Sequence, residues 1–206
     1  MLVRSIPIRH QLLNFCSRLG RRSGCSSKKT ISRIDANETV DLSGNWNDTD
    51  SRLTAEEMVR DCLARPWLDE FVAAKKEKPR VIVGTVLNKS SEHITTETFV
   101  KDLEREVLNS GRAKFVAAKT ERDEVRDERT DQARNSSLKT AKSMGQEHGA
   151  DYMLRGQINT IEDAAGKQVV KYYQVELELV DMLTNEQAWI GQKKIKKLVQ
   201  YKKNRF

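Results

Sequence analysis

Residues 172–195, YYQVELELVDMLTNEQAWIGQKKI, determine the fold class predicted for this chain. In the first half of this stretch, apolar and polar side chains alternate strictly, with Tyr173, Val175, Leu177 and Leu179 on one side and Gln174, Glu176 and Glu178 on the other. A period of two is typical of a strand with one buried face and one wet face. Residues 184–186 predict a turn, and residues 188–195 then return as a second strand.

The same pattern continues toward the amino terminus. Residues 152–161 alternate, and Ala164-Ala165-Gly166 predicts a turn, so we expect an antiparallel meander of three strands. Further upstream, residues 81–87 (VIVGTVL) form a continuous β-branched run. Such a run is typical of a central strand that is covered on both faces.

Helical periodicity separates these strands. The stripe in residues 55–63 has i, i+3, i+4 spacing, and Asp50 or Thr54 is expected to cap this helix. Further helices are expected at 67–74, 99–108 and 137–147, and short strands at 39–44 and 114–118. The helix between the apolar strands at 81–87 and 114–118 predicts a right-handed parallel crossover.

These elements predict an α/β (α+β) fold, a single sandwich domain in which helices pack on a mixed sheet of roughly five or six strands. The sheet ends in the antiparallel three-strand meander. The chain is accordingly divided into a leader (1–24), a polar linker (25–38), a globular domain (39–200) and a basic tail (201–206).

The net charge of +7 is concentrated at the two ends of the chain. Residues 1–30 and 191–206 each contain seven Lys or Arg and no acidic residue, whereas residues 31–190 contain 23 basic and 30 acidic side chains. A nucleic-acid-binding domain carries its basic charge on a folded face. The sequence therefore argues against a nucleic-acid partner.

The sequence offers no recognisable catalytic or phosphate-binding motif, and its three histidines lie far apart. Cys16, Cys25 and Cys62 have no metal-ligand spacing, and Cys62 falls on the apolar face of a helix as a buried small residue. We therefore expect a non-enzymatic protein with no metal, no cofactor and no small-molecule substrate.

Two features are candidates for partner binding. If residues 120–134 form a helix, Asp123, Asp127 and Asp131 lie in one row and repel one another. One interpretation is a solvated face in which ion pairs such as Asp123–Arg126 reduce this repulsion. The other is a charged face that docks on a partner. Trp46 stands in a polar turn, as either an interface anchor or a residue that caps the edge of the sheet. Both alternatives stay open at the level of sequence.

Residues 23–27, SGCSS, are typical of a bacterial lipoprotein processing site, which would make Cys25 the lipid-modified first residue of the mature chain. The preceding leader is interrupted by six basic residues, whereas a secretory signal contains an uninterrupted apolar run. A miscalled start would explain this, and an Arg- and Ser-rich leader without acids is also typical of a transit peptide.

Five ordered segments resemble the LpoB-type lipoprotein activators of penicillin-binding proteins: SGCSS (23–27), DLSGNWNDTDSRLTAEEMVRDCL (41–63), RVIVGTVLNKSSEHI (80–94), GADYMLRGQINTI (149–161) and YYQVELELVDMLTNEQAWIGQKKIKK (172–197). The last segment also resembles the end of the TolB amino-terminal domain. The resemblance covers about residues 23–198.

This resemblance implies an outer-membrane lipoprotein, facing the periplasm and held by lipid on Cys25, that docks on a bifunctional class A penicillin-binding protein and activates peptidoglycan synthesis. The alternative is an envelope structural or trafficking module with the same fold and no synthase partner. Cys25 to Thr39 is 15 residues, so the linker reaches at most about 50 Å.

Overall fold

The computed structural model describes residues 30–136 and 147–201, and the chain divides into two units, Met1–Asp35 and Ala36–Phe206. The second unit contains all of the described helices and strands. In order along the chain, these are α1 (Asp48–Leu63), α2 (Pro66–Lys75), β1 (Arg80–Lys89), α3 (Thr96–Asn109), β2 (Lys114–Phe115), α4 (Lys119–Asn135), β3 (Tyr152–Ala165), β4 (Gln168–Asp181) and β5 (Gln187–Gln200). Most of the helix expected at 137–147 lies outside the described residues.

The five strands form one sheet in the order β2-β1-β3-β4-β5. β1 pairs in parallel with β2 and β3, whereas β3, β4 and β5 pair antiparallel. The mixed sheet, the meander at its carboxyl end and the parallel β1–α3–β2 connection are therefore confirmed. The register places Leu177 opposite Gly156 on β3 and Gly191 on β5.

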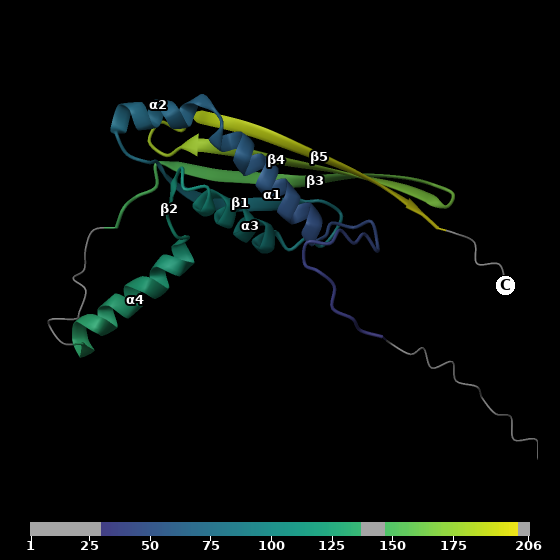
Figure 1. Cartoon of the computed structure of the whole chain (residues 1–206), viewed down its shortest axis with the longest axis horizontal. Coiled ribbons are helices and arrows are strands. Elements are labelled where there is room, and N and C mark those ends of the chain that lie inside the picture. The colour runs from purple at the N-terminus through teal and green to yellow at the C-terminus, as the bar shows by residue number, and fades with distance from the viewer. Residues whose placement is uncertain (1–29, 137–146, 202–206) are drawn as a thin grey trace, which may run out of the picture. The chain divides into compact units, whose positions relative to one another are not determined.

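The helices α1, α2 and α3 cover one face of the sheet (Figure 1). The core lies between these two layers and includes the inward-facing side chains of β4 predicted from the sequence, Tyr173, Val175, Leu177 and Leu179. Because a strand alternates its side chains, the residues between these four face away from the helices. We call that second surface the outer face.

The expectation that β1 is covered on both faces was wrong. Val81, Val83 and Val86 are buried against the helices, but Leu87 on the other side is 51% exposed. The pairing of β1 with β3 shifts between Val83 and Val86, so the apolar residues follow an irregular strand. This bulge explains why Val83 and Val86, three residues apart, both face the helices, while the apolar Leu87 lies on the uncovered face.

The amino-terminal end of α1 also differs from expectation. Asn47 caps the helix: its side chain accepts a hydrogen bond from the Asp50 backbone, and Asp50 accepts one from the Asn47 backbone. This reciprocal capping box replaces the predicted cap at Asp50 or Thr54. No strand forms at residues 39–44; the backbone carbonyls of Val40 and Gly44 accept hydrogen bonds from the side chains of Asn47 and Tyr173 instead.

Candidate interaction surfaces

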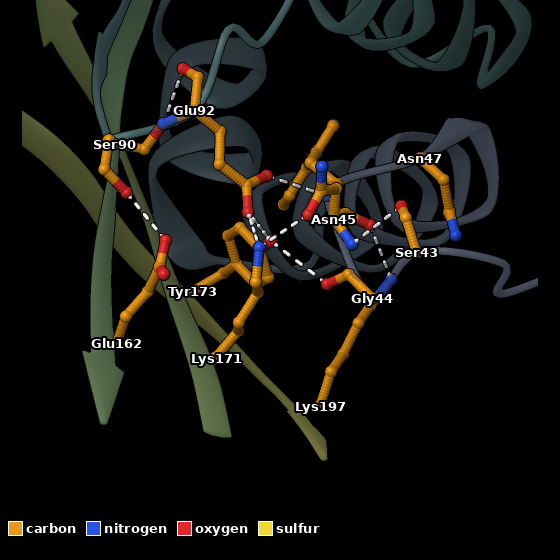
Figure 2. A network of polar contacts seen from close by, with 12 residues as sticks. Ser43, Gly44, Asn45, Asn47, Ser90, Glu92, Glu162, Lys171, Tyr173 and Lys197 are labelled. Atoms are coloured by element: carbon orange, nitrogen blue, oxygen red, sulfur yellow. Dashed lines mark hydrogen bonds and ion pairs between the residues drawn. The ribbon is translucent and has the colours of Figure 1, made fainter. Parts of the chain in front are cut away.

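The loop formed by residues 41–47, here called the N-terminal loop, is held by Glu92 (Figure 2). The two carboxylate oxygens of Glu92 accept three hydrogen bonds, from the Trp46 backbone N–H at 3.1 Å, from Lys171 Nζ at 2.6 Å and from the Tyr173 hydroxyl at 2.7 Å. Burial by itself would raise the pKa of Glu92. The bonds from Lys171, Tyr173 and Trp46 outweigh it and lower the pKa below its usual value of 4.5.

Lys197 of β5 holds the same loop from the other side. Its Nζ lies 2.7 Å from Asp41 Oδ1 and 2.6 Å from Asp50 Oδ2, and it donates to the Asn45 carbonyl at 3.1 Å. Burial opposes the charge on Lys197, but the bonds to the two carboxylates raise its pKa overall. The loop is therefore clamped by charged groups from β4, from β5 and from the segment after β1.

Trp46 lies inside this clamp. Its ring makes edge-on contacts with Phe99 at 6.0 Å and with Tyr173 at 5.7 Å between ring centroids, and it is only partly buried. Aromatic pairs favour such edge-to-face geometry. Trp46 thus closes one end of the core, and its use as a partner anchor stays a prediction.

The outer face of the sheet carries a polar ladder centred on Glu176. Gln157, Glu176 and Gln192 are paired across β3, β4 and β5. Glu176 accepts hydrogen bonds from Gln157 at 2.8 Å, Gln174 at 2.5 Å and Gln192 at 3.3 Å. The bond from Gln157 is the main reason that the pKa of Glu176 is lowered. The ladder keeps a charged carboxylate on an uncovered surface.

A shallow hollow of about 510 Å³ lies beside this ladder. Its lining combines the apolar side chains of Leu87, Met153 and Ile190 with the charged side chains of Arg155, Glu176 and Glu178. Leu87 and Ile190 are exposed. Apolar side chains rimmed by polar ones are typical of a surface that binds another protein.

The charged segment 120–134 is helical and forms most of α4, which has no buried residue. Arg126 contacts Asp123 at 2.6 Å, as expected from the sequence, and Glu147 at 2.7 Å. Asp131 accepts a bond from Asn135 at 2.7 Å, and all three aspartates of the predicted row are exposed. The row is accessible, but its use in docking stays a prediction.

The structure does not join the two predicted partner-binding features. Trp46 precedes α1 and the aspartate row lies on α4, and no hydrogen bond or ring contact in the described residues links them. Cys25 lies outside the described residues. Cys62 is buried as expected, and burial raises the pKa of its thiol to about 12, which keeps it protonated and unreactive.

Two further kinds of feature are absent from the described ranges. No group of three or more His, Cys, Asp or Glu residues there is arranged to hold a metal ion. No helix of these ranges combines the length and the apolar character that crossing a bilayer requires.

The N-terminal loop clamp and the hollow were not predicted from the sequence. A partial signal for the clamp exists, since Lys171 and Lys197 occupy inward-facing positions in the alternation of β4 and β5. A lysine on the buried side of a strand requires a carboxylate partner. The sequence does not say which carboxylate that is.

Solved structures similar to this chain have low sequence identity to it. The C-terminal domain of LpoB from Escherichia coli is 14% identical with a TM-score of 0.45, covering 71% of this chain and 98% of that chain. The NMR structure of E. coli LpoB is 13% identical with a TM-score of 0.35, covering 97% of this chain and 96% of that chain. Lipoprotein GNA1162 from Neisseria meningitidis is 16% identical with a TM-score of 0.37, covering 61% and 88%. No curated protein sequence matches.

A family model described as the peptidoglycan-synthase activator LpoB matches residues 50–195. This match is well over half of the chain and runs from the first turn of α1 into β5. It therefore includes β1 to β4, most of β5 and, apart from the first two residues of α1, the three helices that cover the sheet. On this evidence, the chain belongs to the LpoB family of peptidoglycan-synthase activators.

Proposed function

We propose that this protein docks on a bifunctional class A penicillin-binding protein and activates its peptidoglycan synthesis, without supplying catalytic groups of its own. The observation that carries the proposal is the family match over residues 50–195. Binding would act by favouring the active conformation of the synthase, and it raises activity only as far as it prefers that state.

The test is a glycan-polymerisation assay with purified class A synthases of the same cell, with and without the full chain. Increased output of glycan strands at saturating protein supports the proposal. Unchanged output across these synthases would remove it, and would leave the envelope structural or trafficking module as the remaining function.

The docking surface that we propose includes the aspartate row of α4, Asp123, Asp127 and Asp131. The side chains of this row are exposed, and no residue of α4 contributes to the core. Exposed charge of one sign accelerates the encounter with a partner of the opposite sign. The hollow on the outer face, which includes the exposed side chains of Leu87 and Ile190, is available as a second contact for the partner.

Replacing Asp123, Asp127 and Asp131 with lysine should slow association with the synthase at low salt by at least roughly tenfold, because electrostatic steering acts mainly on the rate of encounter. The thermal midpoint should change little, since these side chains are exposed. Stopped-flow association at several salt concentrations measures the effect. The matched control reverses three exposed acids elsewhere, Glu38, Glu70 and Asp163. Equal slowing by both triple variants would show that net charge, and not this row, guides docking.

The proposed membrane attachment is through lipid on Cys25, in an outer-membrane protein that faces the periplasm. Cys25→Ser should then allow a high-salt wash to release the protein from the membrane fraction, because anchoring that resists salt requires covalent lipid. Fractionation followed by a high-salt wash measures this. Release of the unsubstituted protein by salt alone would show that the basic leader holds it electrostatically, and would refute lipid attachment.

A further inference from the structure

The four lysines at 193, 194, 196 and 197 are sorted by the period of β5 into two pairs. Lys193 and Lys197 face the helices, where Lys193 pairs with Glu57 and Lys197 pairs with Asp41 and Asp50. Lys194 and Lys196 face the opposite way and are exposed, and neither has an ion-pair or hydrogen-bond partner in the described residues. Two of the four charges are therefore available for a ligand outside the chain.

Apolar or aromatic side chains flank Lys196, whereas Lys194 lies opposite Gln174. The register aligns Lys196 with Tyr172 and Tyr172 with Ile161 across the outer face, and Leu198 follows on β5. Ile161 is 66% exposed and Leu198 is 58% exposed. We call the group of Ile161, Tyr172, Lys194, Lys196 and Leu198 the distal patch. It differs from the hollow, which lies nearer the β4–β5 turn and contains two carboxylates; one carboxylate, Asp163, lies next to the patch in the same row as Leu198.

The distal patch lies at the end of the sheet that extends past the helices (Figure 1). Residues 161–168, which include the β3–β4 turn, are all exposed. Flat, exposed apolar side chains interspersed with lysine and tyrosine are suited to the boundary between water and lipid, where the apolar groups enter and the charged groups remain at the phosphates.

The last described residue of the chain lies beside the β3–β4 turn, whereas the N-terminal loop contacts the opposite, helix-covered face of β5. The N-terminal loop is attached to β5 through the bond between Asp41 and Lys197, and the Tyr201 N–H donates to the Lys167 carbonyl beside the β3–β4 turn at 2.9 Å. The sequence is basic toward both termini, with seven Lys or Arg residues in 1–30 and three in 202–206.

We propose that the distal patch binds the surface of an anionic phospholipid bilayer and thereby orients the domain on the membrane. The short linker favours lipid over an acidic protein as the occupant. Cys25 and Thr39 are separated by at most about 50 Å of chain, so a lipid-anchored domain stays close to the bilayer. This inference rests on the proposed lipid attachment through Cys25 and does not depend on docking to a synthase.

The test uses the full chain carrying Cys25→Ser, so that covalent lipid plays no part. Sedimentation with phosphatidylcholine vesicles containing phosphatidylglycerol should show binding that weakens with salt. Phosphatidylcholine vesicles alone should bind much less. Lys194→Gln with Lys196→Gln should weaken binding to the anionic vesicles roughly 25-fold, since each lysine at such a surface is worth roughly fivefold in affinity. Ile161→Ser with Leu198→Ser should also weaken it.

The matched control is Lys75→Gln with Lys119→Gln, which removes the same charge from exposed positions on α2 and α4. This variant should bind within about twofold of the parent chain, and all variants should keep the same thermal midpoint. An equal loss of vesicle binding in the two double lysine variants would overturn the proposal, because binding would then depend on net charge and on the basic ends of the chain. Absence of binding to the anionic vesicles would overturn it as well, and would leave an acidic protein surface as the occupant.

Discussion

Replacing Glu92 with glutamine should lower the free energy of unfolding by about 3 kcal/mol, because the change breaks a largely buried ion pair. The side chains of Glu92 and Lys171 are only 11% and 14% exposed, and their atoms lie 2.6 Å apart. Glutamine keeps the size of the side chain and can still accept from Tyr173. The charge of Lys171 would remain in place without its counter-ion, and this accounts for most of the cost.

Urea denaturation of the full chain measures this effect, with Glu162→Gln as the matched control. Glu162 is exposed and accepts one bond from Ser91, so its replacement should cost little. A double variant, Glu92→Gln with Lys171→Met, removes both charges and should cost less than the sum of the single changes. Strictly additive costs would contradict the proposed coupling of this pair.

The same group gives the unfolding free energy a pH dependence. The folded-state pKa of Glu92 is lowered, so its contribution is fully present above the unfolded pKa and is lost as pH falls through the folded value. Between about pH 5 and pH 3, the unsubstituted chain should therefore lose more stability than Glu92→Gln does. Parallel pH profiles of the two proteins would mean that folding does not lower the pKa of Glu92.

Replacing Gly156 with alanine should also destabilise the domain by about 3 kcal/mol, at the upper end of the usual cost of overpacking. A Cβ atom at this position would lie 2.1 Å from the backbone carbonyl oxygen of Glu176 and 2.6 Å from Leu177 Cδ2. The close approach to a backbone atom of the neighbouring strand cannot be relieved by rotating a side chain. β3 and β4 would have to separate in the centre of the sheet.

Thermal unfolding compares this variant with Gly149→Ala, where a Cβ atom would meet nothing within 4 Å. The control should unfold within a few degrees of the unsubstituted protein, whereas Gly156→Ala should unfold far below it. An unchanged midpoint for Gly156→Ala would mean that β3 and β4 do not approach so closely at this position.

The sequence predicted the sheet well because alternation is a local property. For each residue from Tyr173 to Leu179, the alternation with its immediate neighbours indicates the side of the sheet on which its side chain lies. The structure buries the four residues that this pattern assigned to the core. The aspartate row of α4 follows from helical period in the same way. The continuous apolar run of β1 led to a wrong prediction because it, too, is a local pattern. The bulge between Val83 and Val86 depends on pairing with β3 and not on the run itself.

Charge segregation at the two ends of the chain was also visible in the sequence, because it requires only counting. The sequence did not show which of these charged side chains form ion pairs within the domain. The period of β5 separates Lys193 and Lys197 from Lys194 and Lys196, but the sequence alone does not show that the first pair meets carboxylates on α1 and in the N-terminal loop.

The tertiary structure alone decided which distant groups meet. Glu92 lies 46 residues from Trp46, and Lys197 lies 156 residues from Asp41. In each case the partners meet only because the sheet brings β4 and β5 next to the segments before α1 and after β1. Strand and helix periods fix which way a side chain points, since this depends on the backbone within a few residues. They do not fix which group it faces across the fold, because that depends on the packing of the whole domain.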